Sequence, residues 1–165
     1  MTLQERIDNY HISFPKYPRM LVDKGWLMGI WVLGNMYKRP NPEYYGAYPG
    51  NYLKRLLSLF PDRQQTCHLF SGTLQACPKE VTVDLNPAYS PSVLADVNAL
   101  PFAPNSFDVI IADPPYSAKD AVNYNLPMIS RGKVMRSVRS VTKTGGHLAW
   151  LDTVRPMYSK TMWKQ

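Results

Sequence analysis

The chain has 165 residues, 45% of them apolar and 19% charged, a size and composition that suit one globular domain with its own core and exclude two full ones. No apolar run approaches the length of a membrane span, and Glu5 and Asp8 interrupt the N-terminus too early for a signal peptide. Cys67 and Cys77 do not form a disulfide framework, so we expect a cytoplasmic protein with reduced thiols and no membrane contact.

The positive charge of the chain is concentrated near its C-terminus. The net charge is +7, and residues 131–165 hold eight basic side chains against a single acid, Asp152, whereas the first 130 residues carry equal numbers of both signs. Such a patch fits a polyanion such as nucleic acid. A solvated basic face explains the charge about equally well when charge is considered alone.

The N-terminal part is rich in Tyr, Trp, Met and Pro and has little periodicity. We therefore interpret residues 1–48 as an aromatic extension that packs on a core domain formed by residues 49–165. Residues 23–37 could form either a helix or a pair of strands. From Asn51 the spacing of apolar residues predicts a helix that exposes Lys54 and Arg55 on its polar face and ends before Pro61-Asp62.

Short apolar runs separated by turns follow this helix and predict five strands, at residues 66–70, 81–85, 93–97, 107–112 and 147–151. A helix is predicted over 132–141 with Thr144-Gly145-Gly146 as its C-terminal turn, and a further helix is predicted to start within 155–164. This pattern is typical of a mostly parallel sheet in an α/β fold.

The connections between the first three strands are shorter than ordinary parallel crossovers, so we expect shortened or missing crossover helices. One face of the sheet would then be thinly covered. We expect the N-terminal extension, a second copy of the chain or a partner subunit to cover this face, because an exposed apolar face of that size favours association.

The fourth predicted strand is followed at once by Asp113-Pro114-Pro115-Tyr116. Open parallel sheets bind ligands at the carboxyl ends of their strands. Two successive prolines fix the backbone and donate no N–H, which leaves the neighbouring carbonyls available as acceptors. An acid, a carbonyl and an aromatic ring in four residues suit a planar amino group on a ring.

Taken together, these segments resemble the class I methyltransferases that use S-adenosylmethionine, and most of all the enzymes that methylate adenine N6 or cytosine N4 in DNA. The resemblance covers Tyr48 to Leu151 and rests on ordered features: a glycine turn at Phe70-Ser71-Gly72, an acid after the second and after the third strand, and then the Asp-Pro-Pro-Tyr box. It implies a reduced Rossmann-like methyltransferase sheet that ends before the family's last two strands.

The resemblance also implies a binding site for S-adenosylmethionine, formed by Phe70, Ser71, Gly72, Asp84, Asp96, Val97 and Asp113. Asp84 would accept hydrogen bonds from the ribose hydroxyls. Asp96 would meet the adenine amino group of the cofactor, beside the backbone of Val97. Each of the two acids could instead only begin a turn, Asp96 about as readily as it could bind.

For the box, the resemblance implies amino-group methylation. The carboxylate of Asp113 and the carbonyl of Pro114 would bind the two amino protons of the target base, and Tyr116 would stack on its ring. A base in a duplex would have to be flipped out to reach the site.

Phosphate contacts would come from Lys133, Arg136 and Arg139 on the basic helix. The loop before this helix contains Asn123, Tyr124 and Asn125, which could touch a base or simply link two elements. No metal is expected, because no cluster of cysteines and histidines is present.

Two positions depart from the family pattern: His68 stands where an acid is usual, and Leu74 where a second glycine is usual. We therefore keep alternatives to a DNA adenine methyltransferase. One is an enzyme that methylates base amino groups in RNA; another is a non-catalytic nucleic-acid-binding subunit of a methyltransferase complex. A protein glutamine substrate is disfavoured, since those enzymes usually have Asn in place of Asp113.

Overall fold

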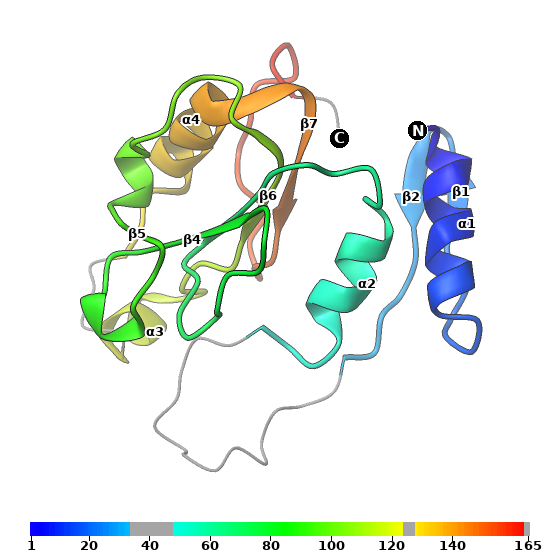
Figure 1. The fold of residues 1–165 in the computed structure, drawn as a ribbon, viewed down its shortest axis with the longest axis horizontal. Coiled ribbons are helices and arrows are strands. Elements are labelled where there is room, and N and C mark those ends of the chain that lie inside the picture. Colours follow the sequence, from blue (N-terminus) through cyan, green and yellow to red (C-terminus); the bar gives the residue numbers. More distant parts are fainter. Residues whose placement is uncertain (34–47, 124–127, 164–165) are drawn as a thin grey trace. The chain divides into compact units, whose positions relative to one another are not determined.

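The computed structural model describes residues 1–33, 48–123 and 128–163 (Figure 1). These residues form two compact units, the first made of 1–33 with 48–63 and the second of 64–123 with 128–163. No helix in the described parts of the chain is long and apolar enough to span a membrane.

The first unit contains two helices and a hairpin: α1 (Leu3–Ser13), β1 (Leu21–Asp23), β2 (Trp26–Met28) and α2 (Tyr52–Ser58). Helix α1 begins with a capping box, in which Thr2 and Glu5 each accept a backbone N–H of the other. The strands β1 and β2 pair antiparallel around Lys24-Gly25, both at positive φ, as a tight hairpin turn requires. Of the two alternatives left open for 23–37, a helix or a pair of strands, the described residues show a pair of strands, which begins two residues earlier, at Leu21.

Arg55 on α2 corrects the predicted polar face. Lys54 is exposed as expected, but Arg55 is only 2% exposed. Its guanidinium donates from Nη1 to the carbonyl of Val32 at 3.2 Å and lies 3.9 Å from the centre of the Tyr17 ring. The prediction failed because an arginine can be buried where a carbonyl and an aromatic face receive its charge.

The second unit is built on a five-stranded sheet in which all neighbours are parallel, in the order β5-β4-β3-β6-β7. Its strands are β3 (Thr66–Leu69), β4 (Glu80–Asp84), β5 (Val93–Leu94), β6 (Phe107–Ala112) and β7 (Thr142–Trp150). This confirms the predicted α/β class with a parallel sheet. The chain moves outward from β3 through β4 to β5 and then returns to β6 beside β3, so the winding reverses between β3 and β6.

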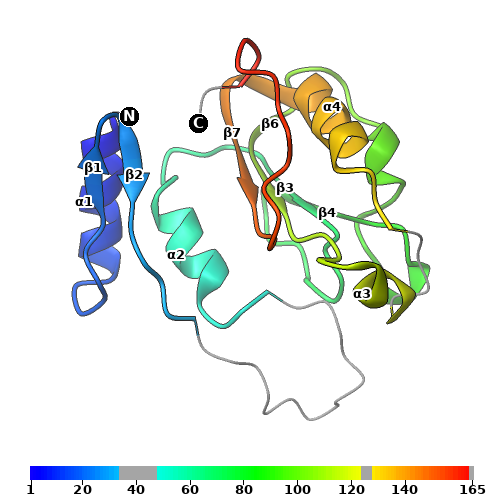
Figure 2. The ribbon, with the colours of Figure 1, turned by 180° about the vertical axis from the view of Figure 1, so that it is seen from behind.

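Helix α4 (Arg131–Val141) packs its apolar side on the core and leads directly into β7 (Figure 2). Its valines at 134, 138 and 141 are buried in the main core cluster with Leu69 from β3 and Ile110 from β6. The period of 3.6 residues that predicted the helix is the same period that aligns these valines on one face.

The connections from β3 to β4 and from β4 to β5 are short and contain no α-helix. Residues 70–79 between β3 and β4 contain no helix. The link from β4 to β5 has a single 3₁₀ turn, η1 (Pro87–Tyr89), and a second, η2 (Val97–Ala99), follows β5. Thr82 and Ser92 close the link between β4 and β5, because the Ser92 N–H donates to Thr82 Oγ1 at 2.9 Å and the two hydroxyls lie 3.0 Å apart.

Several predicted boundaries are wrong. Strand β5 has two residues rather than five, because the chain turns at Asp96. The predicted turn after the helix lies inside β7, which starts directly at Thr142. Gly146 fits there because a Cβ would lie 3.1 Å from the carbonyl of Asp108. The loop before α4 holds a short helix, α3 (Ala118–Asn123), and no helix is present over 155–163.

Candidate functional site

The carboxyl ends of three adjacent strands lie at one level of the sheet. Leu69 in β3 pairs with Val83 in β4 and with Ala112 in β6. The residue after each of these, Phe70, Asp84 and Asp113, therefore begins the same edge. Since neighbouring strands lie about 4.8 Å apart, Asp84 and Asp113 are separated by two strand spacings, about 10 Å. The switch point between β3 and β6 lies between them, which is where open α/β sheets bind ligands.

The glycine turn and Asp84 are joined to each other. Phe70 and Gly72 both have positive φ, 56° and 52°, a conformation that glycine adopts without strain. The N–H of Gly72 donates to Asp84 Oδ2 at 2.9 Å, and the N–H of Asn86 donates to Oδ1 at 2.9 Å. Asp84 is 7% exposed, so these bonds hold its carboxylate at the end of β4.

Ser71 adds a second polar group to this turn. It is 1% exposed, and its Oγ has no hydrogen-bond partner among the described residues. A buried hydroxyl without a partner in the protein is uncommon, and a water or another small molecule can satisfy it. Leu74 closes the turn through its N–H to the Ser71 carbonyl at 3.0 Å and is half-buried.

Asp96 and Val97 follow β5 at the same edge, and the Ala95 N–H bonds the Asp84 carbonyl at 3.1 Å. Asp96 is exposed and caps η2, its Oδ1 accepting from both the backbone and the side-chain nitrogen of Asn98. The side chain of Val97 is buried in the core.

The Asp113–Tyr116 segment follows β6 directly, and the chain bends at its last residue. Pro114 and Pro115 are buried, Asp113 is half-buried, and Tyr116 is 37% exposed. The Tyr116 hydroxyl donates to Asp113 Oδ1 at 2.8 Å. Burial raises the pKa of Asp113 to about 6; the Tyr116 bond lowers the pKa and the charge of Asp152 raises it. This acid is therefore an acceptor whose charge changes close to neutral pH.

Sequence reasoning missed an ion pair beside this segment. Arg131 binds Asp152 through two nitrogens, with Nε at 2.7 Å from Oδ2 and Nη2 at 3.1 Å from Oδ1, and Nη2 also donates to the Tyr116 carbonyl at 3.3 Å. The one available signal was that Asp152 is the only acid among the last 35 residues.

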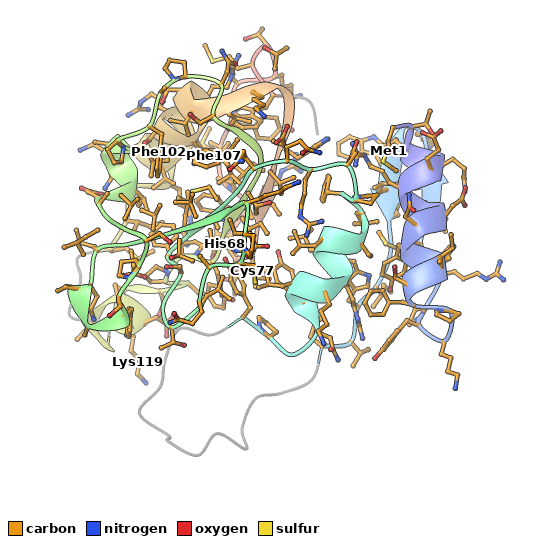
Figure 3. All side chains as sticks on the ribbon, viewed as in Figure 1. Met1, His68, Cys77, Phe102, Phe107 and Lys119 are labelled. Carbon is orange, nitrogen blue, oxygen red and sulfur yellow. The ribbon has the colours of Figure 1, made fainter. Side chains whose placement is uncertain are left out.

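His68 lies at the centre of the sheet (Figure 3), fully buried, with Nε2 at 3.6 Å from Glu80 Oε2. The same figure shows Phe102 beside Phe107, whose rings meet edge to face with centroids 4.9 Å apart. Within the described ranges, no three His, Cys, Asp or Glu side chains come close enough together to hold a metal ion.

The candidate nucleic-acid residues on α4 are exposed, namely Lys133, Arg136 and Arg139. Lys143, which follows on β7, is instead 3.1 Å from Asp108 in an ion pair. In the preceding loop, the side chain of Asn123 and both Tyr124 and Asn125 lie outside the described residues.

A scan against models of protein families finds no match to this chain. A search of curated proteins likewise finds no similar sequence.

Proposed function

We propose that this protein is an S-adenosylmethionine-dependent methyltransferase that acts on an exocyclic amino nitrogen of a nucleic-acid base, with adenine N6 in DNA as the first candidate. The observation that best supports this proposal is the arrangement at the switch point. On one side, Gly72 after β3 is hydrogen-bonded to Asp84 at the end of β4. On the other side, the Asp113–Tyr116 segment follows β6. Five parallel strands in a Rossmann-like order support this reading.

The donors and acceptors near Gly72 fit the ribose part of the cofactor. Each oxygen of the Asp84 carboxylate already accepts one backbone N–H, and each retains acceptor capacity for a ribose hydroxyl. The buried hydroxyl of Ser71 can bond the same molecule. S-adenosylmethionine would supply an electrophilic methyl group when bound.

Asp113 and Pro114 would hold the amino group of the base. With a pKa of about 6, Asp113 is mostly ionised at pH 7 and above, and it can then accept an amino proton. The carbonyl of Pro114 would accept the second proton. Binding both favours a pyramidal nitrogen whose lone pair points away from the ring. For this, Tyr116 must release Asp113 Oδ1 and stack on the base.

The nucleic acid would run along α4. From Lys133 to Arg139 the helix advances about 9 Å, a length that matches one or two phosphate steps of a single strand. Arg131, the first residue of the same helix, contacts the Tyr116 carbonyl. A base bound at Asp113 would therefore have its neighbouring phosphates near these cations.

Calorimetric titration of S-adenosylmethionine tests the cofactor site. We expect binding by the native chain, loss of at least tenfold in affinity for Asp84→Ala, and no change for the control Asp23→Asn, an exposed acid in β1. Absence of binding by the native chain would contradict the proposal.

Transfer of a labelled methyl group tests the box. DNA and RNA oligonucleotides, each with adenine or cytosine replaced in turn, identify the acceptor. Asp113→Ala should abolish transfer even at cofactor concentrations that saturate the variant, and transfer at the native rate would exclude Asp113 from the chemistry. Label in RNA alone would favour the RNA enzyme.

A non-catalytic subunit is the second candidate. It is favoured by His68, which stands within the sheet where the family has an acid, and by the missing helix over residues 70–79. Nucleic-acid binding without cofactor binding would support this function.

A further inference from the structure

Asp152 is a buried acid with an unusual number of partners. Its side chain is fully buried, although it lies only two residues beyond β7. Besides the two bonds from Arg131, it accepts the Trp150 indole N–H at 3.2 Å and the Val154 N–H at 3.2 Å. Burial by itself would raise the pKa of Asp152, but these bonds hold the pKa below its ordinary value, so the side chain stays charged. A buried charge requires such pairing.

Arg131 joins three segments of the second unit. It begins α4, binds Asp152 after β7, and donates to the carbonyl of Tyr116 after β6. Its planar guanidinium suits this role because one fork can bind a carboxylate with two nitrogens and leave a further N–H for a carbonyl.

We propose that Arg131 and Asp152 are positioning residues for the Asp113–Tyr116 segment: Arg131 fixes the Tyr116 carbonyl, and Asp152 holds a compensated negative charge beside the Asp113 carboxyl. The consequence for catalysis rests on the function proposed above, whereas the effect on the Asp113 carboxyl does not.

The charges around Asp113 determine the direction in which its pKa should shift in each variant. Tyr116 bonds it from its own segment. Asp152 lies two residues past Trp150, which pairs with Ala112 next to Asp113, and its charge raises the pKa of Asp113. Arg131 offsets Asp152 from α4. From the sheet, β3 contributes the uncharged Phe70 and Ser71, and the nearest acid on β4 is Asp84, two strands away. Removing Arg131 alone therefore leaves the negative charge of Asp152 uncompensated near Asp113. Removing the charge of Asp152 alone leaves the positive charge of Arg131 uncompensated.

The test is the pH titration of the Asp113 carboxyl carbon by NMR in the full chain. For Arg131→Gln we expect the pKa of Asp113 to rise by about one pH unit, and for Asp152→Asn to fall by about one. Both variants break the same ion pair, so a merely structural loosening would move Asp113 in the same direction in both. The control Arg136→Gln removes an exposed cation of α4 and should leave the titration unchanged.

Shifts in the same direction, or none in either variant, overturn the inference. If Arg131→Gln does not fold, Asp152→Asn is compared with Asp152→Glu, which disturbs the same ion pair but keeps the negative charge. A lower pKa of Asp113 in Asp152→Asn but not in Asp152→Glu supports the inference, and the same shift in both variants, or none in Asp152→Asn, contradicts it. If the Asp113 pKa shifts in opposite directions in Arg131→Gln and Asp152→Asn but no methyl transfer is found under any condition, the inference stands and the proposed function fails. If methyl transfer occurs but the acid limb of its pH profile lies at the same pH in both variants as in the native chain, the proposed function stands and the inference fails.

Discussion

The proposed role of Asp113 and its burial have opposite effects on its charge. As the proposed acceptor it must be charged, yet burial raises its pKa to about 6. An acid with a raised pKa binds its proton more tightly in the folded protein than in the unfolded chain. Between about pH 4 and pH 6 the folded state is therefore the one that holds more protons, and the stability contributed by this group falls as the pH rises through that window.

Asp113→Asn should therefore stabilise the fold at high pH. The shift of the Asp113 pKa from 3.8 to about 6 corresponds to about 3 kcal/mol of unfolding free energy at pH 8. At roughly pH 3 the native acid is protonated in both states, so the variant should gain little there. Urea denaturation at the two pH values measures the difference. Equal changes in unfolding free energy at both pH values would show that folding does not raise the pKa of Asp113.

Tyr116→Phe removes the hydroxyl that lowers the pKa of Asp113. The pKa of Asp113 should move above 6, and the acid limb of methyl transfer should move to higher pH with it. The pH dependence of kcat/KM measures this shift. Tyr158→Phe is the matched control, because that hydroxyl bonds Arg155 in an exposed segment. An unmoved limb in Tyr116→Phe would separate this hydroxyl from the function.

Helix α4 shows how one element serves both the core and the proposed interface. Val134, Val138 and Val141 are at most 1% exposed, whereas Lys133 and Arg136 are exposed on the other side. The sequence predicted this division because the helical period depends only on local spacing. It could not predict that β7 would follow the helix directly, since that depends on how the strand joins β6.

Val138→Ala tests the apolar side of this helix. The side chain is fully buried, so truncation removes apolar contacts and leaves a small cavity; we expect a loss of about 2 kcal/mol in unfolding free energy. Arg139→Ala, the next residue and exposed, should change it by less than about 0.5 kcal/mol. Denaturant unfolding compares the two, and equal losses would contradict the packing of α4.

The whole chain carries its excess charge in one region. The net charge of +7 equals that of residues 131–165, but the structure shows that not all of these cations are available, because Arg131 and Lys143 are paired with acids. Lys133, Arg136 and Arg139 on α4 remain exposed. Charge counting from the sequence could not separate the paired cations from the exposed ones, since the partners are distant in the chain.

Replacing Lys133, Arg136 and Arg139 together by Gln should weaken nucleic-acid binding. If each contacts one phosphate, the slope of log binding constant against log salt should fall by about 2 to 3. The control replaces Lys16, Arg19 and Lys24 by Gln, which removes the same charge from exposed positions in the first unit. Fluorescence anisotropy at several salt concentrations measures both. Equal slopes in the two triple variants would exclude a specific role for α4.

Local features of this protein were determined by its sequence alone. The strand over 107–112 and the helix predicted over 132–141, which the structure has at Arg131–Val141, follow from apolar spacing, which neighbouring residues impose. Helix α1 was missed although its capping box was in the sequence.

Only the tertiary structure decided which residues meet at the carboxyl edge of the sheet. It joined Gly72 to Asp84 across 12 positions and Arg131 to Asp152 across 21, and it buried Arg55. The physical reason is that a hydrogen bond or an ion pair depends on distance in space. The strand order, which places β6 beside β3, sets that distance, and no local pattern in the chain encodes it.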